Sequence, residues 1–162
     1  MIKCVIVEDD KFSQMALVDT IAAHCKNVEV QAVCSTPEEG VAAITKLYPN
    51  LVLLDIDMPG MSGFEMLKLV GDIDFEVIFT TSYNEYVLDA IRNNAFDYLT
   101  KPIKPAELKD SIDRLLQKKV RARNRKFEQL AESLGAAGKN RRIALPTFEG
   151  FIFVNVKDSR SP

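Results

Sequence analysis

The chain has 162 residues, 47% of them hydrophobic, enough to bury one full core and leave a remainder. Its formal net charge of −2 gives no overall basic field that would draw it to nucleic acid. No segment reaches the roughly 18 apolar residues of a membrane span, and the early acids of MIKCVIVEDD do not fit a signal peptide. The cysteines, which lack CxxC spacing and indicate free thiols in a reducing cytoplasm, are Cys4, Cys25 and Cys34. We therefore expect a cytoplasmic protein without a membrane partner.

Short apolar runs alternate with helical patterns along the first two thirds of the chain. The predicted strands are 2–7, 28–34, 51–54, 75–80 and 96–99. The predicted helices run to about His24, from Thr36 to before Pro49, from Ser62 through Val70, over 87–91 and from near Pro105. The first helix is predicted from the helical spacing of Phe12, Met15, Ala16, Ile21 and Ala22. Two helix starts are marked by capping boxes, Thr36 with Glu39 and Ser62 with Glu65.

This alternation predicts a parallel sheet with helices on both faces. Strands and helices alternate five times, and right-handed crossovers distribute the helices over the two faces of such a sheet. The run 51–54 is apolar throughout, as expected for a strand that is buried on both sides. We predict a doubly wound α/β domain with a five-stranded parallel sheet, ending near residue 118.

Polar side chains follow four of the predicted strands. They are Glu8 and Asp9, Asp55, Thr81, and Lys101. The carboxyl ends of parallel strands meet at one edge of the sheet, where open α/β sheets bind their ligands. Three converging carboxylates cannot all stay ionised without a cation, and an all-oxygen ligand set favours Mg²⁺. The alternative is that these acids only cap helices, a role that suits Asp10.

Four segments carry a family resemblance: VIVEDD, LVLLDIDMPGMSG, VIFTTS and DYLTKPI. In order and spacing they resemble the signatures of the receiver domain of two-component response regulators, over about residues 1–118. The resemblance implies a flavodoxin-like sheet of order 2-1-3-4-5 and a Lys101–Pro102 bond that is commonly cis. It also implies a phosphorelay switch, not a turnover enzyme, that accepts a phosphoryl group on Asp55 from a sensor histidine kinase.

The resemblance also implies how the metal is bound. Asp9 and Asp55 would bind Mg²⁺ directly, and Glu8 would bind it through water. The main-chain carbonyl of Asp57 would complete the protein ligands. The carboxylate of Asp55 would thus be both a metal ligand and the phosphoacceptor.

Further positions would act on the phosphoryl group. Thr81 would hydrogen-bond its oxygens, and Lys101 would pair with them. Asp57 and Tyr83, each two residues beyond a key site residue, would border the path of the attacking water. Tyr98 matches the switch aromatic of the family, which turns inward when Thr81 moves toward the phosphate.

A Mg²⁺-dependent phosphatase of the haloacid dehalogenase type is the alternative function. That family also has an Asp-x-Asp motif after an apolar strand, which Asp55 and Asp57 would supply, together with a Thr or Ser and a Lys. Chain order argues against it, because its acidic metal ligands normally follow the lysine, whereas Glu8 and Asp9 come first here.

A linker helix is predicted over 119–140. From Leu116 onward, apolar residues recur at intervals typical of a helix that pairs with another helix: Leu116, Val120, Phe127, Leu130 and Leu134. We therefore expect a homodimer, strengthened by phosphorylation through a second interface around Tyr98. The basic run KKVRARNRK is either a solvated face or a contact to the DNA backbone.

The last segment, 141–162, begins with two predicted strands, 142–146 and 150–154. The stretch RRIALPTFEGFIFVNVKD resembles the opening of a LytTR-type DNA-binding domain, which implies a transcription regulator. Two strands cannot build a core alone, so we expect an incomplete domain here. DNA would then be bound specifically only through a full-length C-terminal domain.

Overall fold

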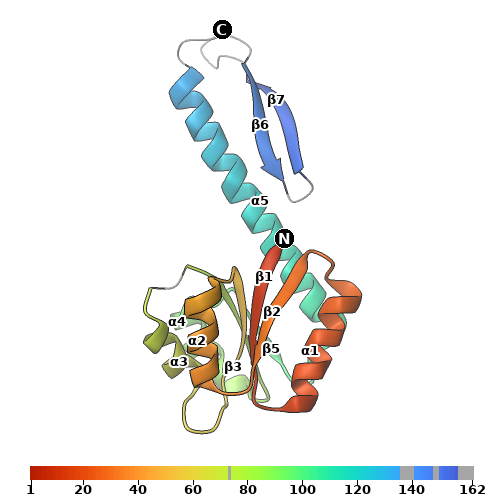
Figure 1. The fold of residues 1–162 in the computed structure, drawn as a ribbon, viewed down its shortest axis with the longest axis vertical. Coiled ribbons are helices and arrows are strands. Elements are labelled where there is room, and N and C mark those ends of the chain that lie inside the picture. Colours follow the sequence, from red (N-terminus) through yellow and green to blue (C-terminus); the bar gives the residue numbers. More distant parts are fainter. Residues whose placement is uncertain (73, 136–140, 148–149, 157–162) are drawn as a thin grey trace. The chain divides into compact units, whose positions relative to one another are not determined.

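The computed structural model describes residues 1–72, 74–135, 141–147 and 150–156 (Figure 1). Its elements are β1 (Ile2–Val7), α1 (Lys11–His24), β2 (Val28–Cys34), α2 (Pro37–Leu47), β3 (Leu51–Asp55), α3 (Gly63–Val70), β4 (Glu76–Thr81), the 3-10 turn η1 (Asn84–Tyr86), α4 (Val87–Arg92), β5 (Asp97–Thr100), α5 (Pro105–Gly135), β6 (Arg141–Thr147) and β7 (Gly150–Val156). The chain forms two compact units, residues 1–112 and 113–162.

The first unit is a five-stranded sheet in the order β2-β1-β3-β4-β5, with every neighbouring pair parallel. Helix α1 covers one face, and α2, α3 and α4 cover the other (Figure 1). The predicted doubly wound fold and its strand order are confirmed. Because all five strands run in the same direction, their carboxyl ends share one edge of the sheet.

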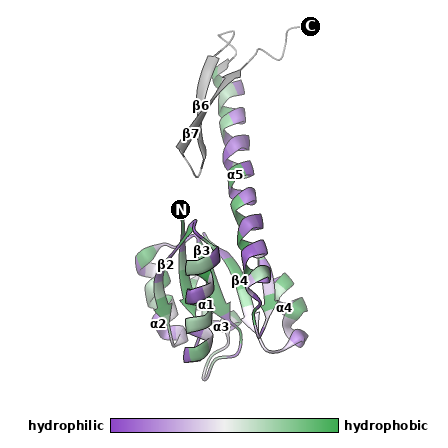
Figure 2. Cartoon of the chain, turned by 90° about the vertical axis from the view of Figure 1, so that its right-hand side faces the viewer, coloured by the Kyte–Doolittle hydropathy of each residue, from purple (hydrophilic) through white to green (hydrophobic). Residues whose placement is uncertain are grey.

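The central strand is held from both faces. All five residues of β3 are buried, and Figure 2 shows that hydrophobic residues are concentrated in the strands of the sheet. The start of α3 lies close to the carboxyl end of β3, since a Cβ added to Gly63 would lie 2.6 Å from the main-chain oxygen of Asp55. The amide of Gly63 donates to the carbonyl of Ile56 at 2.9 Å. A residue without a side chain at Gly63 therefore lets the loop after β3 close tightly around Asp55.

Helix α1 forms where expected, but its buried face differs from the predicted apolar stripe. Phe12 is 83% exposed and Met15 is 62% exposed. The buried residues are Gln14, Leu17 and Ile21. The N-cap Asp10 accepts a hydrogen bond from the amide of Ser13 at 2.9 Å and so stabilises the start of the helix.

Helix starts and strand ends agree closely with the sequence. Thr36 and Ser62 cap α2 and α3 through their side chains, as predicted. Strands β4 and β5 each lie one residue later than expected, and η1, which precedes α4, was not predicted. The Lys101–Pro102 peptide bond is cis, in agreement with the resemblance.

The second unit contains most of α5 and a hairpin. Helix α5 runs unbroken from Pro105 to Gly135. It continues past residue 118, near which the sequence predicted a domain boundary, and this boundary stays a prediction. Strands β6 and β7 pair antiparallel, with Arg141 opposite Val156, and are longer than predicted at both outer ends. Residues 136–140, which complete the predicted linker helix, residues 148–149 and residues 157–162 lie outside the described ranges. Within those ranges, every helix is too short or too polar to span a lipid bilayer.

Candidate functional site

Three carboxylates meet at the carboxyl edge of the sheet. Glu8 and Asp9 follow β1, Asp55 ends β3, and one carboxylate oxygen of each lies within 4.8 Å of the others. Glu8 and Asp55 are buried, with 0% and 2% of their surface exposed, whereas Asp9 faces solvent. The structure therefore brings together the three acids that the sequence predicted to converge.

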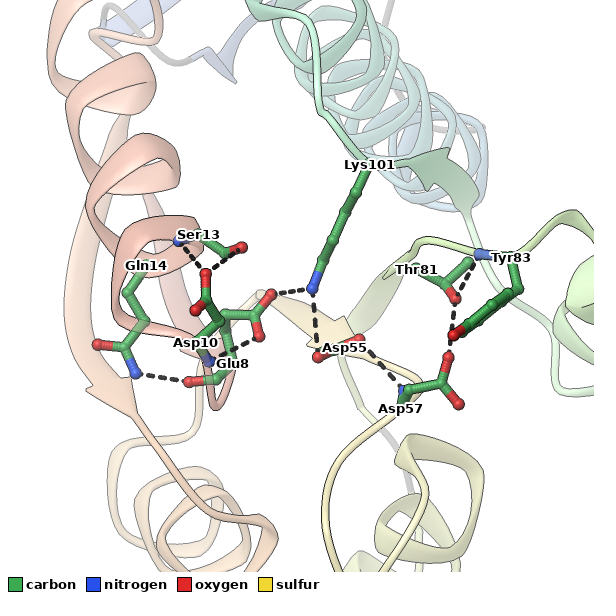
Figure 3. A network of polar contacts seen from close by, with 9 residues as sticks. All are labelled: Glu8, Asp10, Ser13, Gln14, Asp55, Asp57, Thr81, Tyr83 and Lys101. Carbon is green, nitrogen blue, oxygen red and sulfur yellow. Dashed lines mark hydrogen bonds and ion pairs between the residues drawn. The ribbon is translucent and has the colours of Figure 1, made fainter.

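Lys101 reaches this cluster from the loop after β5 (Figure 3). Its Nζ lies 3.3 Å from Oδ2 of Asp55 and forms a second ion pair with Oε1 of Glu8. Burial alone would lower the pKa of Lys101, but the hydrogen bond to Glu8 and the charge of Asp55 raise it above its usual value. Lys101 is therefore a cation that points at the side chain of Asp55.

Asp55 is an unusually weak acid in its buried position. Burial, followed by the hydrogen bond and charge of Glu8, raises the pKa of Asp55 to about 8, although the charge of Lys101 opposes this. Near neutral pH its carboxyl group therefore requires either a proton or an additional positive charge nearby.

The residues present fit a hard divalent cation. The ligand atoms of the cluster are all carboxylate oxygens, which suit Mg²⁺, and the exposure of Asp9 leaves room for water ligands. The cluster also sets three carboxyl groups beside a single ammonium group, so a divalent cation bound to the carboxylate form of Asp55 would offset the excess of acidic groups. Asp57 is the second residue of the loop after β3, and its amide donates to Oδ1 of Asp55 at 3.2 Å.

The raised pKa of Asp55 predicts how Mg²⁺ binding depends on pH. Because the cation binds the ionised carboxylate, the affinity for Mg²⁺ should increase with pH and level off above about 8, where Asp55 is ionised without metal. Calorimetric titration with MgCl₂ from about pH 6 to about pH 9 would measure this. Asp55→Asn should lose most of the dependence, and an affinity in the native protein that is constant over this range would contradict it.

A second network surrounds the Asp57 carboxylate. The hydroxyl of Thr81, at the end of β4, donates to Oδ2 of Asp57 at 3.3 Å and accepts from the amide of Tyr83 at 3.1 Å (Figure 3). The hydroxyl of Tyr86 donates to Oδ1 of Asp57 at 3.2 Å, and this contact raises the pKa of Tyr86. Sequence analysis did not identify Tyr86, because no motif marks a contact made through the turn η1.

Tyr83 and Tyr98, the two tyrosines that the sequence predicted to act at the site, contact each other beside the end of β4. Tyr98 is half-buried in β5, and its hydroxyl donates to the main-chain oxygen of Tyr83. Tyr83 is 53% exposed at the rim of the site. The predicted switch residue thus contacts the segment that directly follows Thr81.

Gln14 is the second site residue that sequence analysis missed. Its Nε2 donates to the main-chain oxygen of Glu8 at 2.5 Å and to Oγ of Ser35 at 2.9 Å. The amide of Asp10 donates to Oε2 of Glu8 at 3.1 Å. These bonds hold the loop after β1 and orient Glu8 (Figure 3).

Comparison with known proteins gives one consistent family. A model of the response regulator receiver domain matches residues 4–113. The chain is 33% identical over 151 residues to a response regulatory protein of Vibrio cholerae, covering 92% of this chain and 63% of that protein. It is 38% identical over 123 residues to the transcriptional regulatory protein BtsR of Escherichia coli, covering 74% of this chain and 50% of BtsR.

Solved structures agree with the sequence comparisons. A CheY-like receiver domain protein of Methanospirillum hungatei has a TM-score of 0.66 at 26% identity, over 75% of this chain and 98% of its own. A LuxR-family DNA-binding response regulator of Staphylococcus aureus has a TM-score of 0.65 at 29% identity, over 70% and 98%. None of these proteins is named as a phosphatase, so they give the haloacid dehalogenase alternative no support.

The matches cover different parts of this chain and of its relatives. The family model ends at residue 113, whereas the alignment with the Vibrio cholerae protein continues over most of the chain. The chain spans only about half to two thirds of the length of the curated relatives it matches. On the evidence of the fold, the acidic cluster and the family match, this chain belongs to the response regulator receiver domain family of two-component signalling.

Proposed function

We propose that this chain is a phosphorylation-controlled switch that accepts a phosphoryl group on Asp55 from a phosphohistidine of a sensor histidine kinase. The observation that supports this most directly is the position of Asp55. It ends the central strand, its Oδ2 lies 3.3 Å from Nζ of Lys101, and it belongs to the three-carboxylate cluster.

In the proposed reaction, a carboxylate oxygen of Asp55 attacks the phosphorus, and the phosphorus–nitrogen bond breaks to release imidazole. The attacking carboxylate and the phosphoryl oxygens are both negative, and Lys101 lies where it can offset their repulsion. Glu8, Asp9 and Asp55, with the main-chain carbonyl of Asp57, would hold Mg²⁺, which supplies further positive charge. Thr81 would then donate its hydrogen bond to a phosphoryl oxygen.

We propose that the phosphoryl group is lost only slowly, so the protein is a switch and not a turnover enzyme. Water must approach the aspartyl phosphate past Asp57 and Tyr83. The negative charge of the Asp57 carboxylate disfavours the build-up of negative charge on the attacking water. The side chain of Tyr83, which is exposed at the rim of the site, restricts the access of water to the phosphoryl group. Both features support a long-lived phosphorylated state.

We propose that the output is control of transcription, through a C-terminal domain of the LytTR type. BtsR is named as a transcriptional regulatory protein, and the similarity to the Vibrio cholerae protein covers 92% of this chain. The antiparallel hairpin β6–β7 supports the predicted start of such a domain. Leu130 and Leu134, which are 54% and 57% exposed on α5, support pairing with a second copy.

The phosphoacceptor function can be tested by intact-mass analysis after incubation with acetyl phosphate and MgCl₂. We expect a stoichiometric gain of one phosphoryl group that requires Mg²⁺ and is reversed by alkali, as an acyl phosphate is. A parallel assay should show no sustained turnover of a generic phosphate ester. Sustained turnover, or no mass gain at any Mg²⁺ concentration, would refute the proposed function.

A further inference from the structure

The Asp57 carboxylate is held at both of its oxygens by hydroxyl groups. Thr81 donates to Oδ2 at 3.3 Å, and Tyr86 donates to Oδ1 at 3.2 Å. Thr81 is completely buried, whereas the side chain of Asp57 is exposed. An exposed carboxylate that could point into water is thus fixed against the hydroxyl that is proposed to recognise the phosphoryl group.

Thr81 has one hydroxyl proton and can donate it fully to one acceptor at a time. To bond a phosphoryl oxygen on Asp55, Thr81 must give up its bond to Asp57. The backbone places the two acids close together, since the amide of Asp57 donates to Oδ1 of Asp55 at 3.2 Å. A phosphoryl group on Asp55 would also bring negative charge toward the Asp57 carboxylate and repel it in its present position.

Tyr86 is well placed to keep the carboxylate there. Its ring packs edge-on against Phe64, with centroids 6.2 Å apart, and against Tyr83 at 6.4 Å. Phe64 in turn packs on the fully buried Phe79 at 4.8 Å. The phenol is therefore anchored to the core through aromatic contacts, and only its hydroxyl reaches Asp57.

We propose that Tyr86 is a positioning residue that opposes phosphorylation by fixing the Asp57 carboxylate as the hydrogen-bond acceptor of Thr81. This rests on the proposed function of Asp55. The contact stabilises the unphosphorylated arrangement more than the phosphorylated one, and only such a difference can shift the balance between two states. Because Tyr86 directly precedes α4, the same contact ties the start of that helix to the loop after β3.

The test compares affinities for beryllofluoride, a mimic of the phosphoryl group, in saturating MgCl₂. Tyr86→Phe removes the hydroxyl and keeps the ring, so the packing on Phe64 is retained. Losing one hydrogen bond to a partly exposed carboxylate should tighten beryllofluoride binding by about 2- to 10-fold. Tyr48→Phe is the matched control, since Tyr48 is 81% exposed after α2 and should leave the affinity unchanged.

The same substitution in an Asp57→Ala background shows whether Tyr86 acts through Asp57. We expect Tyr86→Phe to have no further effect there, which a merely structural role would not predict. Unchanged or weaker binding in the single variant, or an equal effect in both backgrounds, would overturn the inference. A native protein that does not bind beryllofluoride at all would instead refute the proposed function, and this inference with it.

Discussion

Replacing Asp55 with asparagine will abolish phosphorylation by acetyl phosphate. The amide has nearly the same shape as the carboxyl group but lacks the nucleophilic oxygen that would form the acyl phosphate. Asp55 ends β3 in contact with Lys101, within the acidic cluster. Intact-mass analysis in MgCl₂ should show one added phosphoryl group on the native protein and none on Asp55→Asn.

Asp57→Asn is the matched control for this substitution. It makes the same chemical change two residues along the chain, and its main-chain carbonyl, the proposed metal ligand, is retained. This variant should still gain a phosphoryl group. An equal mass gain in the native protein and Asp55→Asn, or a loss of the gain only in Asp57→Asn, would show that the phosphoacceptor has been assigned wrongly.

Lys101→Ala will slow phosphorylation by about 100-fold, because it removes the cation nearest the reacting oxygens. Its Nζ lies 3.3 Å from Oδ2 of Asp55 and is also paired with Glu8. The domain should remain folded near neutral pH, because Asp55, with a pKa of about 8, can keep its proton when Lys101 is absent. The rate would be measured by the time course of the mass gain, with thermal unfolding as the check on folding.

In the same assay, Lys101→Arg tests whether a positive charge is sufficient at this position or whether the compact ammonium group of lysine is also needed. Arginine keeps a positive charge at this position but replaces the compact ammonium group with a planar fork, so the rate should be partly restored. If Lys101→Ala is phosphorylated at the native rate and its response to phosphorylation is also unchanged, Lys101 does not stabilise the transferred group.

The sheet and the acidic cluster could be predicted from the sequence, because both follow from local patterns and from the rules that connect strands and helices. Apolar runs located the five strands of the sheet to within one residue, and capping boxes located the starts of α2 and α3. Right-handed crossovers then require all strand ends to meet at one edge. Parallel strands therefore place Glu8, Asp55 and Lys101 at the same edge of the sheet, and the strand order that the family resemblance implied makes β1 and β3 neighbours.

The pairing of polar groups across the molecule could be seen only in the three-dimensional structure. Phe12 and Met15 are exposed on α1 because Gln14 is buried instead, through hydrogen bonds to Glu8 and to Ser35, 21 residues away. Tyr86 reaches Asp57, 29 residues earlier, only after the turn η1 and the packing on Phe64 have oriented its ring. A hydrophobic period reports which residues can be buried, whereas a long-range hydrogen bond depends on the relative placement of two loops, which no local pattern specifies.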